Sequence, residues 1–253
     1  MTMTTTTNRT GVVKLWLLNI VANAAVLVAW YYWLLIPDGR GWQVGTSALL
    51  AVVVIFSVLW LRAGTLAWFR ALEFRKEAGI WRAYRHSVRY VPALAFWVLA
   101  FVLVALATWE LRAYVPQFAV WLRQKLGAGP TSRNLMNDLN WLLLLFVFFV
   151  MPAIWLPIGA TVSSVGVLPE HLMRSRRVWK RPLYWIGFAL FVAVGVYVPY
   201  RIVWWIPDLR TLRQQAWSMG ARFLIAYLIG VSAFIAVVWM TGVFTDREDP
   251  IAP

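Results

Sequence analysis

The sequence has no cysteine and only two histidines, His86 and His171, in 253 residues. Without cysteine the chain can form no disulfide, no thiolate nucleophile and no cysteine-ligated metal centre. The two histidines lie in separate basic segments, remote from any paired carboxylate, so we expect neither a metal site nor haem ligation. No cofactor is therefore expected.

Acidic residues are also scarce, with 10 Asp and Glu against 24 Lys and Arg and a formal net charge of +14. A charge of this size could indicate a nucleic-acid partner, but the cations cluster in segments between apolar runs about as long as a bilayer is thick. The chain is 62% hydrophobic with a mean hydropathy of +0.68. Because no single water-soluble core can bury that much apolar surface, we expect a membrane protein and no nucleic-acid partner.

The order of the apolar runs predicts an all-α polytopic membrane protein with six transmembrane helices and amphipathic interfacial helices on both faces. A polar tail at residues 1–11 is expected to be disordered, and residues 244–253 form a short acidic tail. Residues 12–243 form the transmembrane domain. Its predicted spans are residues 12–36, 44–61, 93–111, 142–162, 183–200 and 223–243.

Two basic segments, residues 62–92 and 168–182, each precede a span and end in proline. In the first, a helical wheel places arginines opposite Trp81, Tyr84 and Val88, which is the pattern of a helix lying along a membrane surface. The segment 115–126 is a second candidate interfacial helix. We expect anionic lipid headgroups as partners, contacted by Arg75, Arg82, Arg85, Arg89, Arg174, Arg176, Arg177, Lys180 and Arg181.

Lys and Arg are more numerous on the side of the two tails than on the opposite side. The positive-inside rule therefore predicts cytoplasmic N- and C-termini, in a bacterial inner membrane. A sequence echo at an offset of 90 residues, Val88–Pro92 with Val178–Pro182, is the basis for the hypothesis of a parallel internal repeat.

Within the spans, the polar residues that stand out are Asn19 and Asn23, one helical turn apart, and the prolines that interrupt the fourth span, Pro152 and Pro157. Two amides in lipid are costly, so they should face another helix or a polar cavity. Unwound backbone between the prolines would expose carbonyl groups that can coordinate a cation. Both features fit helix packing, and both also fit a solute site.

These patterns favour a non-catalytic membrane protein that engages lipid headgroups or a membrane protein complex through its basic segments. The alternative is a small-solute transporter or channel that uses Asn19, Asn23 and the Pro152–Pro157 segment. An intramembrane enzyme would have to rely on Glu110, His86 or His171, which no nucleophile or paired carboxylate accompanies.

Overall fold

The computed structural model describes residues 4–37, 39–73, 79–126, 131–165, 175–176, 178–208 and 211–246. These residues are almost entirely helical and contain no strand. The helices are α1 (Thr4–Leu34), α2 (Gly41–Glu73), α3 (Ile80–Val88), α4 (Val91–Leu111), α5 (Val115–Leu126), α6 (Ser132–Leu145), α7 (Met151–Val165), α9 (Pro182–Val192), α10 (Val198–Trp204) and α11 (Leu212–Asp246). A 3-10 turn, η1 (Arg112–Tyr114), joins α4 to α5, and two π-helical turns, η2 (Phe146–Val150) and η3 (Ala193–Tyr197), join α6 to α7 and α9 to α10.

Six helical runs are long and apolar enough to cross a membrane, and they confirm the predicted fold class. They are Thr10–Leu34, Gly41–Phe69, Val91–Leu126, Ser132–Ser163, Pro182–Trp204 and Leu212–Gly242. Each contains one of the predicted spans almost completely and extends beyond it at one or both ends. The chain is an integral, multi-pass, tryptophan-rich membrane protein.

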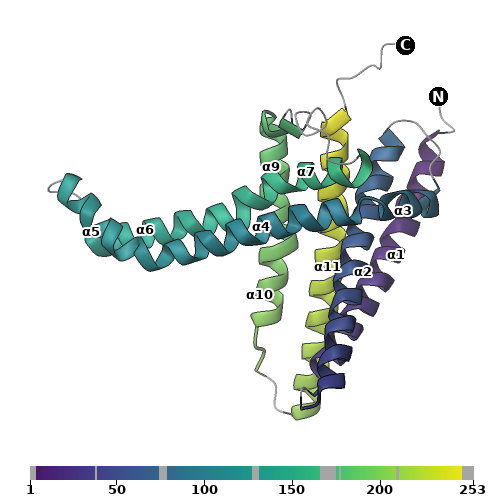
Figure 1. Ribbon diagram of the computed structural model, residues 1–253, viewed down its shortest axis with the longest axis horizontal. Coiled ribbons are helices and arrows are strands. Elements are labelled where there is room, and N and C mark those ends of the chain that lie inside the picture. The colour runs from purple at the N-terminus through teal and green to yellow at the C-terminus, as the bar shows by residue number, and fades with distance from the viewer. Residues whose placement is uncertain are drawn as a thin grey trace.

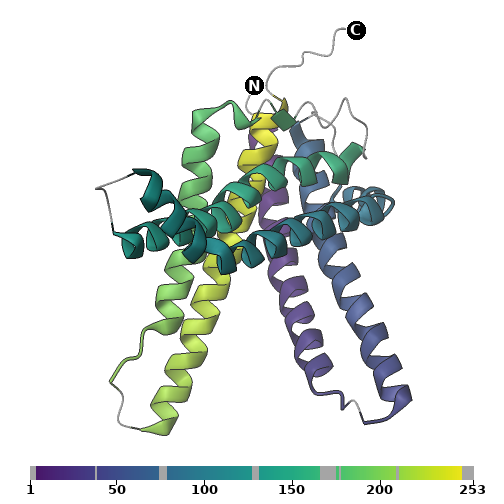
Figure 2. The same cartoon turned by 60° about the vertical axis from the view of Figure 1, so that its left-hand side comes forward.

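Four of the six runs lie lengthwise in two antiparallel pairs, α1 with α2 and α9–α10 with α11 (Figure 1). The hairpin formed by α4–α5 and α6–α7 crosses these pairs, and its outer half extends away from them (Figures 1 and 2). We call this hairpin the arm. The start of α1, the end of α2, the start of α9 and the end of α11 lie at one end of the molecule, which we call the basic end (Figure 1).

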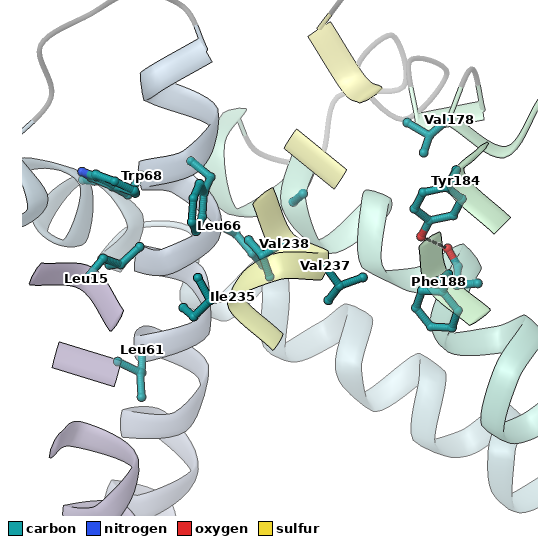
Figure 3. Close-up of a cluster of buried hydrophobic side chains, with 14 of the residues drawn as sticks. Leu15, Leu61, Leu66, Trp68, Val178, Tyr184, Phe188, Ile235, Val237 and Val238 are labelled. Atoms are coloured by element: carbon teal, nitrogen blue, oxygen red, sulfur yellow. Dashed lines mark hydrogen bonds between the residues drawn. The ribbon is translucent and has the colours of Figure 1, made fainter. Parts of the chain in front are cut away.

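The main core lies where the arm crosses the two pairs. Leu15 from α1, Leu61 from α2, Phe188 from α9 and Ile235 from α11 belong to one buried cluster, to which α7 contributes Ala153 (Figure 3). A smaller cluster joins α2 to the arm through its own set of buried residues, Ala63, Val91, Leu94, Ile158 and Val162. Burial of this apolar surface is concentrated near the basic end, while much of the remaining surface is exposed leucine, valine and aromatic residues that lipid can cover.

Proline shapes two of the helical runs without breaking them. Each π-helical turn ends two residues before a proline, Pro152 after η2 and Pro199 after η3. Proline lacks the N–H that an α-helical turn requires, and a wider turn is one local adjustment to that loss. The expected unwinding between Pro152 and Pro157 is not found, because α7 is continuous from Met151 to Val165 with Pro157 inside it.

Other differences from the sequence-based expectations are local. Helix α1 begins at Thr4, so the helix of the first apolar run continues into the threonines. It therefore includes most of the segment 1–11, which is expected from the sequence to be disordered. The segment 115–126 forms a helix with the predicted bounds, and α5 continues the α4 run at the outer part of the arm. The two hairpins of the proposed repeat, α4 to α7 and α9 to α11, run in different directions (Figure 1), so the repeat remains a hypothesis.

A candidate polar site between α1, α2, α3 and α11

Helix α3 is held against α2 by Tyr84. Its ring lies over Gly64, and a Cβ atom on that glycine would come within 2.6 Å of the ring carbons. The backbone carbonyl of Tyr84 accepts hydrogen bonds from Trp60 Nε1 at 2.9 Å and from Ser87 Oγ at 2.9 Å. A glycine in α2 thus allows the close approach that brings the Tyr84 hydroxyl into the interior.

The Tyr84 hydroxyl belongs to a buried hydrogen-bond network that joins three helices. It lies 3.0 Å from Thr65 Oγ1, and Asn19 Nδ2 donates to the same Thr65 oxygen at 3.2 Å. Asn19 Nδ2 also lies 3.0 Å from the Leu15 carbonyl, and Thr65 Oγ1 lies 2.8 Å from the Leu61 carbonyl. Asn19 and Thr65 are fully buried, so these bonds supply the partners that polar groups need away from water.

Asn23 extends the network to a charged residue. Its Nδ2 donates to the Asn19 carbonyl at 2.6 Å, and its Oδ1 accepts a hydrogen bond from Arg62 Nη2 at 2.9 Å. The Arg62 guanidinium carbon lies 4.2 Å from the centre of the Phe234 ring of α11, a cation–π contact. Arg62 Nη1 is buried and has no hydrogen-bond partner. A positive charge thus lies within the second apolar run, and none of the described carboxylates pairs with it.

Helix α11 closes the other side of this group. Tyr227 donates a hydrogen bond from its hydroxyl to the Ile20 carbonyl, and Trp16 Nε1 donates to Ser232 Oγ at 3.0 Å. Arg62, Asn23 and Tyr227 remain partly exposed at the surface of the helix group. The polar site therefore runs from the buried Asn19–Thr65 pair to the partly exposed side chains of Asn23, Arg62 and Tyr227.

The pKa of the Tyr84 phenol is raised above its ordinary value mainly because burial disfavours the phenolate. The hydrogen bonds of Thr65 and Asn19 and the positive charge of Arg62 act in the opposite direction and offset part of that rise. Tyr84 is consequently a neutral hydrogen-bonding group at physiological pH.

The prolines form a separate feature of α7. Pro157 has no N–H to offer the carbonyl of Ala153, four residues earlier, and the Tyr184 hydroxyl donates to this carbonyl at 2.6 Å (Figure 3). Asn19 and Asn23 form hydrogen bonds with α2, whereas the carbonyl that Pro157 leaves without a donor accepts a hydrogen bond from α9. No hydrogen bond between described residues joins the two sets. The alternative hypothesis places all four residues at one site, and the hydrogen bonds of Asn19 and Asn23 involve different helices from the one beside Pro157.

The arginines predicted to contact lipid fall into three groups. Arg82, Arg85, Arg89, Arg176 and Lys180 are exposed, and Arg181 is partly buried. Arg75, Arg174 and Arg177 lie outside the described residues. The apolar residues of α3 differ in burial. Tyr84 is buried against α2, while Trp81 and Val88 are exposed beside the arginines.

Among the candidates for acid or base chemistry, Glu110 and His86 are exposed and His171 lies outside the described residues. Arg112, beside Glu110, donates to Asn140 Oδ1 at 3.3 Å and lies over the ring of Trp109. The described residues contain no cluster of three metal-ligating side chains.

An open cleft of about 600 Å³ lies at the end opposite the basic end, between the α10–α11 loop and the start of α11. Its lining residues are Trp205, Pro207, Arg213, Gln214, Trp217 and Ser218. Arg222 fixes the loop by donating to the carbonyls of Val203 and Trp205. The cleft is mainly apolar and wide open, which is typical of an interfacial surface rather than of a catalytic pocket.

No protein-family model, curated protein or solved structure matches this chain. Sequence reasoning identified Asn19 and Asn23 but did not identify Arg62, Thr65 or Tyr84 as part of their site. The sequence does contain a signal for Arg62, because this residue directly follows an apolar run long enough to include it. Its charge instead places it in the basic segment 62–92.

Proposed function

We propose that this integral membrane protein binds anionic lipid headgroups at its basic end and has no catalytic activity. The observation that carries the proposal is the exposed face of α3. Arg82, Arg85 and Arg89 are exposed there next to Trp81, which is 67% exposed. Indole and aliphatic groups favour the boundary between headgroups and hydrocarbon, and arginine side chains bind phosphate.

The charge distribution supports the same proposal. Among described side chains the carboxylates are Glu110, Asp138 and Asp208, which lie on the arm and in the α10–α11 loop. Among the described side chains, the arginines of α3 therefore have no acidic partner. A cation near an anionic leaflet contributes about 1 kcal/mol, so three of them would strengthen lipid binding by about 3 kcal/mol at low salt.

The rigidity of α3 also supports a docking role. Because Tyr84 is bonded to Thr65 and its carbonyl to Trp60, the helix presents its arginines in a fixed arrangement. Binding then incurs little of the ordering entropy that a mobile basic segment would lose. We place the protein in a bacterial inner membrane with this face in the cytoplasm, as the distribution of Lys and Arg predicts.

The test is retention of lipid by the full-length protein in native mass spectrometry after extraction in mild detergent. The variant R82Q/R85Q/R89Q should lose most of its bound phosphatidylglycerol. Raising the salt concentration should release lipid from the wild-type protein in the same way. The matched control, R123Q/K125Q/R133Q, removes the same charge from exposed positions on the arm and should retain lipid. Equal retention by both variants would refute the proposal, and a stoichiometric protein partner displaced only by the α3 variant would assign the surface to a protein complex instead.

A further inference from the structure

We propose that Arg62 is the centre of a specific binding site for one phosphate group, supplied by an anionic lipid that enters beside α1 and α11. This site differs from the α3 surface in being partly buried and in having defined geometry. The inference does not depend on the surface binding proposed above.

Arg62 carries an unbalanced charge. A guanidinium has five N–H donors and a permanent positive charge, yet among the described residues Arg62 donates a single hydrogen bond, to Asn23. Nη1 is buried without a partner. Partial burial of a charge without a counter-charge is unfavourable, and among the described side chains no carboxylate lies in this group of helices. An anion would satisfy both the unpaired donor and the charge.

Two neighbours fix the guanidinium of Arg62 in place. Phe234 covers one face at 4.2 Å, and Asn23 accepts from Nη2, so the plane of the group is held in place. Asn23 is in turn fixed by its bond to the Asn19 carbonyl. A guanidinium with a fixed plane suits the two-pronged recognition of phosphate, which a mobile surface cation achieves less well.

The position of Arg62 along α2 also fits contact with a lipid phosphate. Arg62 is 21 residues after Gly41, so along α2 it lies about 32 Å from the start of the helix, against a hydrocarbon thickness of about 30 Å. If Gly41 marks one boundary of the bilayer, Arg62 lies at the other, where lipid phosphates lie. The next residue, Ala63, packs against the arm, whereas Arg62 faces α1 and α11 through Asn23 and Phe234.

The experiment measures thermal unfolding of delipidated full-length protein with added ligand. The probes are short-chain phosphatidylglycerol, short-chain phosphatidylcholine and inorganic phosphate. Wild type should be stabilised by phosphatidylglycerol, and Arg62→Gln should need about tenfold or more ligand for the same shift. Arg62→Lys keeps the charge but loses the fork, and should show an intermediate response.

The control is R82Q/R85Q/R89Q, which should keep the Arg62-dependent shift. A shift of equal size with inorganic phosphate, also lost in Arg62→Gln, would assign the same phosphate site to a ligand from water. Without ligand, Arg62→Gln should be as stable as wild type or more stable, because it removes a partly buried charge whose Nη1 has no hydrogen-bond partner. A phosphatidylglycerol shift that is unchanged in Arg62→Gln would overturn the proposal.

Discussion

The Tyr184 hydroxyl donates a hydrogen bond to the carbonyl of Ala153 at 2.6 Å, and this carbonyl is the one that Pro157 leaves without a helical partner. A residue on α9 thus compensates for a proline in α7. This explains why α7 remains continuous where two prolines predicted an unwound segment. The bond also ties the arm to the α9–α11 pair, since both residues are buried in the core.

We expect Tyr184→Phe to destabilise the protein by about 1–3 kcal/mol, because the Ala153 carbonyl would then be buried without a donor. Pro157→Ala supplies a backbone N–H for that carbonyl. In the Pro157→Ala background, Tyr184→Phe should therefore cost clearly less. Thermal unfolding of the four proteins in the same detergent gives the coupling, and an equal cost in both backgrounds would show that Tyr184 does not serve this carbonyl.

Gly64→Ala should separate α3 from α2, because the new Cβ would lie within 2.6 Å of the Tyr84 ring. The matched control is Gly45→Ala in the same helix, where no atom lies within 4 Å of the added Cβ. We expect Gly64→Ala to lower stability by about 1–3 kcal/mol, as overpacking does, and Gly45→Ala to be neutral or stabilising. Proteolysis near α3 should increase only in the first variant.

The sequence predicts the six helices well because their signal is local: each needs only a run of apolar residues of bilayer length. It predicts less about helix contacts, which depend on which faces meet. Several small residues lie in the fifth span, and the sequence does not show which of them meets another helix. Ala189 and Ala193, one helical turn apart, are both exposed. The close approach is at Gly195 of η3, where an added Cβ would lie 2.6 Å from that of Ala233 of α11.

The candidate site likewise has residues that the sequence predicts and partners that it does not. Asn19 and Asn23 were identifiable because polar residues are rare in an apolar run, and their shared face follows from the helical repeat. Their partners could not be identified, since Thr65 and Tyr84 lie 46 and 65 positions away from Asn19 and carry no local signal. Tyr84 was interpreted as facing lipid because a helical wheel cannot distinguish lipid from another helix.

A double-mutant cycle on Asn19→Ala and Thr65→Ala tests whether the buried pair holds α1 to α2. Interhelical hydrogen bonds in membranes contribute about 0.6 kcal/mol on average and up to about 1.7 kcal/mol. We expect a coupling energy toward the upper value, because both residues are fully buried. Unfolding by denaturing detergent would give the coupling, and additive effects of the two changes would contradict the hydrogen bond.

Stability should decrease at high pH through Tyr84. Its pKa is raised by burial, so above about pH 10, the value for an unfolded tyrosine, the folded state holds a proton that the unfolded state has released. This contribution is complete below about pH 10 and is lost as the pH rises through the folded-state pKa. Tyr84→Phe lacks the hydrogen bond to Thr65, so it should be less stable than wild type near neutral pH. It should also lose less stability than wild type as the pH rises. Parallel curves for the two proteins would show that Tyr84 ionises normally.

Labelling of single cysteines in cells tests the predicted orientation, and the cysteine-free sequence makes every introduced thiol unique. Gly41 and Gly79 are both exposed, and no atom lies within 4 Å of an added Cβ at either position. With cytoplasmic termini, Gly41→Cys should react with a membrane-impermeant maleimide in intact cells, and Gly79→Cys should react only after permeabilisation. Gln124→Cys, exposed at the outer part of the arm, should react like Gly41→Cys, because the predicted topology places the connection between the third and fourth spans outside. The reverse pattern at Gly41 and Gly79 would place the arginines of α3 outside the cell, where the cytoplasmic leaflet could not be their ligand.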